Sequence, residues 1–343
     1  MKYKTGFRSI IFAAALVCIA AGLCACGMFP DFEPDIEENE ESGTEELIVI
    51  GYSQLGSESI WRTANTVSMQ RAFTKENGFF LIMENGRQRQ ENQIKSIRSF
   101  ISQRVDYIVF SPVTATGWDT VLQEAKDAGI PVIITDRMVD VADESLYTAW
   151  VGTDAHEEGK KAGYWLEQDL KKRGLQYEDI NIVVLKGTEG SSAADGRSAG
   201  FLEVAQRYSN WHIVAEGCGD FTPAKGKEVM KTILKEHPDI DVIVSQNDDM
   251  TFGALEAVHE AGLTTGIRGD IILISFDATR EALEMVEKGV INVDVECNPE
   301  QGEEVVELIR KLEAGESVEK KNPVEEQVFS ISNVGQYMDE RTY

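Results

Sequence analysis

The sequence has few cysteines and histidines and is short of basic residues. Five cysteines and four histidines occur in 343 residues, with no CxxC pair and no Cys/His cluster, so neither a disulfide framework nor a metal site is expected. Lys and Arg number 33 against 59 Asp and Glu, a formal net charge of -26, which leaves no basic surface for nucleic acid. What is present, 42% hydrophobic and 27% charged residues, is ordinary for a globular protein of about two domains. A small molecule is therefore the better candidate for a ligand.

The first 25 residues have the pattern of a signal peptide. Three basic residues and no acidic one precede an apolar run at 10–23, which is too short to span a bilayer stably. The run ends in Leu-Cys-Ala-Cys at 23–26, which resembles the lipobox of bacterial lipoproteins, with Leu23 three residues before Cys26. This resemblance implies that Cys26 is acylated and becomes the mature N-terminus, held at the membrane by two or three acyl chains. An ordinary secretory peptide and an uncleaved N-terminal anchor are the alternatives.

Residues 26–46 form an acidic segment ahead of the predicted fold. Nine acidic residues and only four aliphatic or aromatic ones lie between 28 and 46. Such a segment cannot bury a core, and its charges repel one another. We therefore expect an extended tether without a binding role.

From residue 46 onward, apolar runs alternate with amphipathic segments. The runs typical of strands lie at 47–52, 79–83, 107–110, 132–135, 147–151, 180–185, 212–216, 241–245 and 271–275. Helical spacings lie between them and after them, at 60–76, 91–103, 118–128, 155–172, 193–207, 223–236, 250–261 and 300–312. Continuous apolar strands separated by helices are typical of a parallel α/β sheet buried on both faces. Because the pattern restarts near residue 147, we predict two doubly wound parallel-sheet lobes, with the last helix returning to the first lobe.

Polar residues follow several of these strands directly. In open α/β sheets, ligands bind beyond the carboxyl ends of the strands, so these residues are candidates to line a cleft between the lobes. They are Ser53, Gln54, Asp136, Arg137, Asp195, Arg197, Asn247 and Asp277. Their mixture of carboxylate, amide and guanidinium groups suits the hydroxyls of a neutral polyol, with Trp61 and Trp118 as candidate aromatic faces. Asp249 is expected to cap the helix that begins near residue 250, while Asn247 faces the ligand.

At these residues the sequence resembles the periplasmic sugar-binding proteins of the ribose/galactose type, and among them the galactofuranose-binding branch. The resemblance spans about residues 47–340. Its most specific stretches are 51–59 with Trp61 and Arg62, 90–95, 116–118, 220–222, 226–230 and 247–250. It implies a type I periplasmic binding protein, in which two lobes joined by a multi-strand hinge close on a monosaccharide without any cofactor, metal or catalytic step.

Ligand-binding roles carry over from this resemblance position by position. The Asp-Arg pair that follows the fourth strand in the family falls on Asp136 and Arg137. The Arg, Asn and Asp that the family places in its second lobe fall on Arg197, Asn247 and Asp277.

The first loop carries the features of the furanose branch. Its aromatic residue and its Arg match Trp61 and Arg62, and Glu58 lies in the same loop. The sequence departs from the branch at Ile60, where a small residue is usual. It also departs at Cys297, near a hinge position where ribose binders carry a polar ligand residue.

The resemblance also implies boundaries, location and partners. After a signal peptide at 1–25 and the tether at 26–46, the first lobe is expected at 47–152 with 298–328, and the second at 153–297 with 329–343. The hinge is expected near Gly152, Cys297 and Phe329. The expected protein is an extracytoplasmic, lipid-anchored monomer that presents a monosaccharide, with a hexofuranose such as galactofuranose preferred, to the permease of an ABC importer.

Two other functions remain open from the sequence. One is a sensor receptor that passes a ligand signal to a membrane kinase or chemoreceptor through the same cleft. The other is a secreted glycosidase with Asp136 and Asp277 as acid and base. A glycosidase is disfavoured because both carboxylates are expected to be ionised through pairing with Arg or hydrogen bonding, whereas its acid needs a raised pKa.

Overall fold

The computed structural model describes residues 46–343, so the predicted signal peptide, Cys26 and nearly all of the acidic tether lie outside it. No helix within 46–343 is long and apolar enough to cross a membrane.

The first lobe contains β1 (Ile48–Gln54), α1 (Ile60–Ala72), β2 (Phe79–Asn85), α2 (Gln90–Gln103), β3 (Tyr107–Phe110), α3 (Asp119–Asp127), β4 (Val132–Thr135), β5 (Ala149–Gly152), α9 (Gly302–Glu313) and β11 (Lys321–Pro323). The second contains α4 (Ala155–Arg173), β6 (Ile180–Lys186), α5 (Ser192–Ala205), β7 (Trp211–Cys218), α6 (Pro223–Glu236), β8 (Val242–Ser245), α7 (Asp248–Glu260), β9 (Ile272–Asp277), α8 (Arg280–Glu287), β10 (Val293–Glu296) and β12 (Val328–Ser330).

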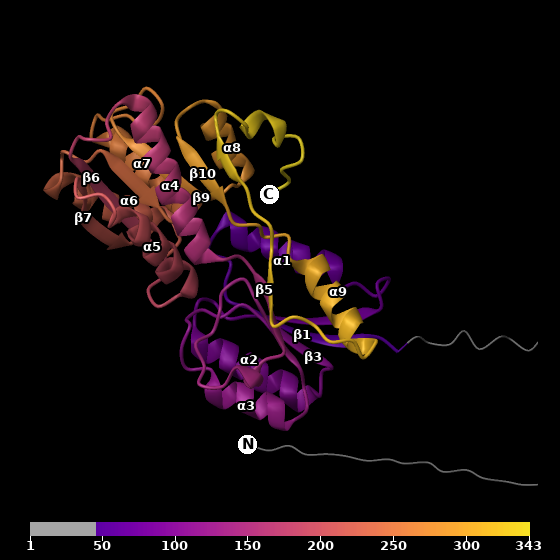
Figure 1. The fold of residues 1–343 in the computed structure, drawn as a ribbon. Coiled ribbons are helices and arrows are strands. Elements are labelled where there is room, and N and C mark those ends of the chain that lie inside the picture. Colours follow the sequence, from indigo (N-terminus) through magenta and orange to yellow (C-terminus); the bar gives the residue numbers. More distant parts are fainter. Residues whose placement is uncertain (1–45) are drawn as a thin grey trace, which may run out of the picture. The chain divides into compact units, whose positions relative to one another are not determined.

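Each lobe is built on one six-stranded sheet (Figure 1). The first sheet has the strand order β11-β5-β4-β3-β1-β2, and all of its strands are parallel. The second has the order β12-β10-β9-β8-β6-β7 and is parallel except for β12, which pairs antiparallel with β10. In both sheets the chain winds outward in two directions from the lobe's first strand, β1 or β6. The predicted doubly wound α/β fold is therefore confirmed.

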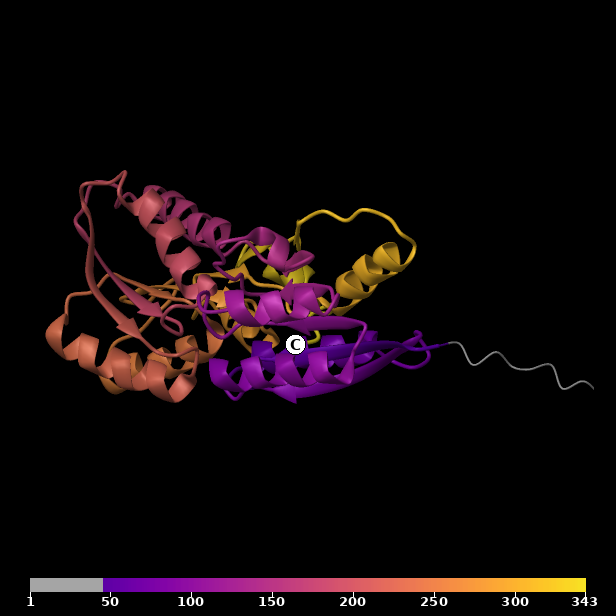
Figure 2. The same ribbon diagram turned by 90° about the horizontal axis from the view of Figure 1, so that it is seen from below.

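Helices cover both faces of the first sheet. The strands β3, β4 and β5 are buried along their whole length, which explains their unbroken apolar sequences. On one face, α2 and α3 lie side by side, as Figures 1 and 2 both show, and their apolar residues share a core with the strands. On the other face, α1 packs beside α9 (Figure 1), so the last helix returns to the first lobe as predicted.

The chain passes between the lobes three times. The crossings are 153–154 between β5 and α4, 297–301 between β10 and α9, and 324–327 between β11 and β12. The expected third boundary, between 328 and 329, lies inside β12, because Val328 already pairs with Val295 of the second sheet. Three short crossings with no long linker are the connections that a hinge between two lobes requires.

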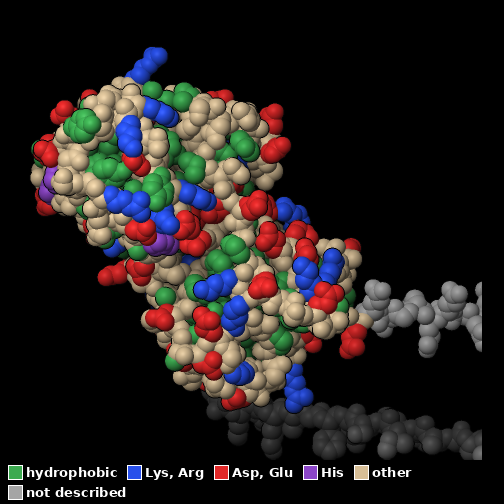
Figure 3. All heavy atoms as spheres, in the orientation of Figure 1, with side chains coloured by type: hydrophobic (Ala, Val, Ile, Leu, Met, Phe, Trp, Pro, Cys, Tyr) green, Lys and Arg blue, Asp and Glu red, His purple; other side chains and the backbone are tan. Residues whose placement is uncertain are grey.

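Charged side chains of both signs are interspersed on the face drawn in Figure 3. Many of them pair across neighbouring elements, as Arg98 does with Glu124 at 2.7 Å and Lys227 with Glu260 at 2.8 Å. Exposed pairs of this kind contribute little to stability, so the fold depends on the two buried sheets.

Candidate functional site

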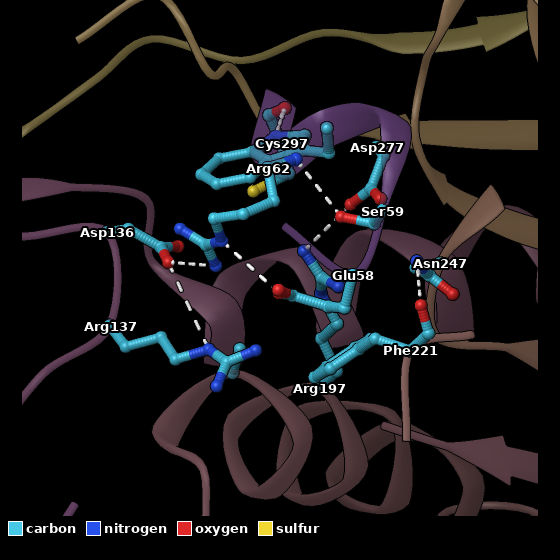
Figure 4. A pocket seen from close by; sticks show the side chains of 12 residues that line it. Glu58, Ser59, Arg62, Asp136, Arg137, Arg197, Phe221, Asn247, Asp277 and Cys297 are labelled. Carbon is cyan, nitrogen blue, oxygen red and sulfur yellow. Dashed lines mark hydrogen bonds and ion pairs between the residues drawn. The ribbon is translucent and has the colours of Figure 1, made fainter. Parts of the chain in front are cut away.

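A cavity of about 290 Å³ lies between the carboxyl ends of the two sheets (Figure 4). Its lining comes from both lobes and from the second crossing, and eight of its residues were predicted from the sequence. Those eight are Glu58, Trp61, Arg62, Asp136, Arg137, Arg197, Asn247 and Asp277. The remaining four are Ser59, Ala193, Phe221 and Cys297. The structure thus brings together strand-end residues that are up to 219 positions apart in the chain, from Glu58 to Asp277.

In the first lobe, Arg62 is the centre of a buried ion network. Ser59 caps α1 by accepting the Arg62 backbone N–H, which fixes where this side chain leaves the helix. The guanidinium donates to Asp136 Oδ2 at 2.7 Å, to Glu58 Oε1 at 3.2 Å and to Ser111 Oγ at 3.3 Å. Burial raises the pKa of Asp136, but the charges of Arg62 and Arg137 outweigh it, so that this pKa lies below its ordinary value. Asp136 is therefore ionised and satisfied within the protein.

Arg137 has much weaker partners than Arg62. Its Nη1 donates to the Val113 carbonyl at 3.0 Å, while its Nε is buried with no hydrogen-bond partner and lies 4.0 Å from Asp136 Oδ2. Burial, followed by repulsion from Arg62, lowers the pKa of Arg137 to about 10. Its guanidinium lies 5.1 Å from the centre of the Phe221 ring. A buried donor without an acceptor costs free energy unless a ligand supplies one.

The two predicted aromatic faces have different roles. Trp61 lines the cavity, donates its Nε1 proton to the Cys297 carbonyl at 2.6 Å, and packs under the Arg62 guanidinium at 4.5 Å. Trp118, for which the sequence left a core position equally open, is fully buried against Phe110 in the core of the first lobe and is not a face of the site.

In the second lobe, Arg197 is fixed by the protein on three sides. It donates to Glu158 Oε2 and to the Gln246 carbonyl, both at 2.5 Å, and its Nη2 lies 3.5 Å from Asp277 Oδ1. The small residues of α4 and α5 allow this arrangement, since a Cβ at Gly200 would come within 2.0 Å of the His156 carbonyl oxygen. Arg197 therefore reaches the cavity from a tightly packed helix pair.

Asp277 does not have the charge state expected from the sequence. Burial raises its pKa well above the ordinary value, Arg197 offsets this only in part, and Asp248 raises it further. Asp248 is itself saturated, because it accepts from Ser275 Oγ at 2.6 Å and from the backbone and side chain of Thr279 at 2.8 Å. The direction of the pKa thus agrees with the expected ionised state for Asp136, whereas at Asp277 burial favours the neutral form over the ionised form that we expected.

Asn247 lines the cavity as expected, but Asn247 and not Asp249 caps α7. Asn247 is the N-cap of α7, since its Oδ1 accepts the Met250 backbone N–H at 3.0 Å, while its Nδ2 stays directed at the cavity side near the Phe221 carbonyl. Asp249 instead accepts the Ile60 backbone N–H across the cleft at 3.0 Å. Burial raises the pKa of Asp249 to about 7, and Asp248 adds to the effect.

Three predicted site residues do not line the cavity. Gln54 is buried in hydrogen bonds to Tyr52 and Asn65 beneath α1, and Ser53 is buried in the same strand. Asp195 is exposed in the first turn of α5, where a carboxylate stabilises the helix N-terminus. Each follows a strand or a loop as predicted, but its side chain points away from the cleft.

Phe221 is the main site residue that the sequence did not indicate. It has a left-handed backbone with φ of 57°, and two other lining residues, Asp136 at 59° and Asp277 at 108°, share this unfavourable region. A Cβ at Gly187 would lie 1.9 Å from the Phe221 ring, so glycine is needed there to seat it. Strained backbone of this kind concentrates at ligand sites.

The lobes are already in contact around the cavity. Besides the Ile60–Asp249 bond, the Ala115 N–H donates to the Gly190 carbonyl at 2.9 Å and the Met138 N–H to Ser192 Oγ at 2.8 Å. The principal charged lining residues are all less than a tenth exposed. The described residues therefore form a closed arrangement.

A second polar cluster joins the three crossings behind Arg197. Ligand-type atoms of Glu158, Cys297 and Glu326 lie within 4.8 Å of one another, and Thr153 Oγ1 is 3.3 Å from Cys297 Sγ. Burial, followed by the charge of Glu158, raises the pKa of Glu326 to about 10 and that of Cys297 well above its ordinary value. The cluster is therefore a buried polar contact at the hinge, in which burial favours the neutral forms of Glu326 and Cys297.

Comparison with known proteins assigns the fold to a family. The model of the periplasmic binding protein domain matches residues 50–317. The chain belongs to this family of binding proteins. The galactofuranose-binding protein YtfQ of Escherichia coli strain K12 is 40% identical over 267 residues, which are 77% of this chain and 81% of that protein.

Two solved structures share both the fold and much of the sequence. A protein from Mycobacterium smegmatis in complex with beta-D-fucofuranose is 43% identical with a TM-score of 0.81, over 86% of this chain and 95% of that one. The binding protein of the arabinose ABC transporter from Shewanella sp. ANA-3, bound to alpha and beta-L-arabinofuranose, is 39% identical with a TM-score of 0.79, over 85% and 95% of the chains. The resemblance seen in the sequence is therefore confirmed, and the family consists of binding proteins and not of glycosidases.

Proposed function

We propose that this protein binds a monosaccharide in its furanose form between the two lobes, as the substrate-binding component of an ABC sugar importer. One observation supports this most directly: the closed cavity presents Arg62, Arg137 and Arg197 together with Asp136 and Asp277 around a single small space. Fixed donors and acceptors in a dry cavity suit the many hydroxyls of a neutral sugar. Relatives that are 39% to 43% identical bind galactofuranose, fucofuranose and arabinofuranose.

Among furanoses, a hexose such as galactofuranose is the ligand that we propose. The resemblance at Glu58, Trp61 and Arg62 supports this choice, and all three line the cavity. Trp61 offers an apolar surface for the C–H edge of the ring, while Asp277, in the neutral form that burial favours, can both donate to and accept from a hydroxyl.

Closure of the lobes is the proposed signal to the permease. A sugar that touches both lobes makes more contacts in the closed form than in an open one, and it shifts the equilibrium by that difference in affinity. The crossings at 153–154, 297–301 and 324–327 are the proposed hinge. A sensor receptor would close in the same way, and the two roles differ only in the membrane partner that reads the closed form.

Attachment to the membrane is proposed through acylated Cys26. The test compares Cys26→Ala with Cys24→Ala in cells that process the signal peptide. The Cys26 variant is expected in the soluble fraction and the Cys24 variant in the membrane fraction. The reverse distribution would overturn the assignment.

A thermal-shift panel of pentoses and hexoses, with methyl furanosides and methyl pyranosides of each, tests the ligand class. A bound ligand stabilises the folded state by mass action, so the best furanoside is expected to give the largest rise in Tm. Stabilisation by an amino acid or a peptide, with no response to any sugar, would overturn the proposal. Arabinose or ribose ahead of every hexose would overturn only the preference for a hexose.

A further inference from the structure

A second cavity opens beside the first. It has a volume of about 680 Å³, counted together with its opening to solvent, and it lies between the lobes next to the first crossing. Twelve residues line it: Asp136, Arg137, Met138, Trp150, Thr153, Asp154, Ala155, His156, Ser192, Ala193, Gly196 and Lys321.

The two cavities share a wall. Asp136, Arg137 and Ala193 line both of them. Arg137 is only 4% exposed, yet its Nε has no hydrogen-bond partner among the described residues. A ligand that fills the first cavity and continues past Arg137 into the second would supply the missing acceptor.

The lining of the second cavity is chemically similar to that of a sugar site. Trp150 offers the edge of an aromatic ring whose Nε1 is already bonded to the Asp136 carbonyl at 3.0 Å. His156 and Lys321 add polar side chains that are partly or fully exposed, and Asp154 adds a carboxylate. This mixture of one aromatic surface with groups of both signs favours neutral hydroxyls.

A phosphate or another anion fits the second cavity less well. Asp154 caps α4 by accepting the N–H groups of His156 and Glu157, so the helix N-terminus is already occupied by a carboxylate. The ionised Asp136 on the shared wall adds a second negative charge. Both repel an anion that enters beside them.

We propose that the second cavity is a subsite for a second sugar residue, so that the protein takes a furanose-containing disaccharide as well as the free monosaccharide. The inference rests on the proposed function, because the furanose unit occupies the first cavity. The second residue lies against Trp150, with its hydroxyls toward His156, Asp154 and Lys321. The glycosidic linkage passes Arg137.

Calorimetric titration of the purified protein with two probes tests the subsite. The probes are methyl β-D-galactofuranoside and a set of disaccharides in which galactofuranose is linked at different positions to a second hexose. At least one disaccharide is expected to bind as tightly as the methyl furanoside or more tightly.

The variant His156→Trp narrows the second cavity at a side chain that is 43% exposed, where a bulky residue can be accommodated. We expect it to weaken disaccharide binding at least tenfold and to change binding of the methyl furanoside less than twofold.

His212→Trp is the matched control, since His212 is similarly exposed at 45% but lies on β7, away from both cavities. It is expected to leave both affinities unchanged. Binding of the methyl furanoside with rejection of every disaccharide would overturn the subsite and leave the proposed function intact. An equal loss of affinity for both probes in His156→Trp would also overturn the subsite. Failure of the wild type to bind either probe, or any other sugar, would overturn the proposed function and the subsite with it.

Discussion

The two lobes contribute similar residue types to the cavity but hold them in different charge states. In the first lobe, Arg62 pairs with Asp136 and Glu58, and the pKa of Asp136 is lowered as a result. In the second lobe, Arg197 is bonded to Glu158 at 2.5 Å and lies 3.5 Å from Asp277, whose pKa is raised. The environment of Asp136 therefore favours an ionised acceptor, while burial at Asp277 favours the neutral form.

This difference indicates that the two sets of side chains contribute to sugar binding in different ways. The Arg62 guanidinium has its acceptors within the protein and gives the first lobe a rigid surface, although Glu58 Oε2 in the same network is buried without a hydrogen-bond partner. Arg137 Nε is buried without a hydrogen-bond partner, and Asp277 Oδ1 lies 3.5 Å from Arg197 Nη2, so both side chains can gain a hydrogen bond when a sugar hydroxyl arrives. Substitutions at the charged residues of each lobe test this comparison.

The largest effect is expected from Arg62→Met. Removing the guanidinium leaves the buried carboxylates of Asp136 and Glu58 without their cation, and loss of one partner of a buried ion pair costs about 3–5 kcal/mol. Urea unfolding measures this loss. Arg98→Met, which breaks an exposed pair with Glu124, is the control and is expected to cost less than about 1 kcal/mol. Equal losses in the two variants would contradict a structural role for the Arg62 network.

The matched substitutions Asp136→Asn and Asp277→Asn are expected to separate the two carboxyls. Asp136→Asn removes an ionised acceptor of two hydrogen bonds and should lower the free energy of unfolding by about 1–3 kcal/mol at pH 7. Asp277→Asn replaces a neutral carboxyl with a neutral amide and should change it by less than about 0.5 kcal/mol. Denaturant titration of both variants is the measurement. A larger loss in Asp277→Asn would show that this carboxyl is ionised.

Arg137→Ala is expected to act on binding and not on folding. Its guanidinium makes one hydrogen bond to the protein, so the protein loses little without it, whereas the sugar loses a charge-assisted bond. We expect affinity to fall at least about tenfold, or about 1.4 kcal/mol, with the unfolding midpoint nearly unchanged. Calorimetry and thermal unfolding check the two halves of this prediction. Unchanged sugar affinity would remove Arg137 from the site.

A pH-dependent effect on sugar affinity is expected from Asp249. Its pKa is about 7 in the closed form, where it is buried near Asp248, Glu58 and Glu281, and should return to about 4 when the lobes separate. Closure therefore takes up a proton between these values, so sugar affinity should fall by up to about tenfold per pH unit as pH rises from about 4 to about 7 and level off above that. Asp249→Asn is expected to flatten this part of the profile. A profile that is identical in the variant and the wild type would exclude Asp249 as its source.

Much of the fold could be predicted because its strands are buried on both faces. The unbroken apolar runs of β3, β4 and β8 match the structure to within one residue. The elements α8, β10, β11 and β12 were not predicted. Acidic residues interrupt the four residues of β10, whereas β11 and β12 have only three residues and α8 only eight, so that none of them shows an unbroken apolar run or a clear period.

The candidate site could be predicted in outline because strand order brings the carboxyl ends together. What the sequence could not give was the direction of individual side chains. Gln54 turns into a buried network under α1, and Trp118 packs into the core. The raised pKa of Asp277 could not be predicted either, because it arises from burial beside Asp248, which is 29 positions earlier in the chain.

The central claim is that one sugar joins the two half-sites and holds the lobes closed. Small-angle scattering of the protein with and without a saturating furanoside tests it directly, with Arg137→Ala as the control at the same sugar concentration. We predict a smaller radius of gyration for the wild type when the sugar is bound, and a weaker response in the variant. A radius of gyration that stays constant within error, although calorimetry shows tight binding, would contradict the account.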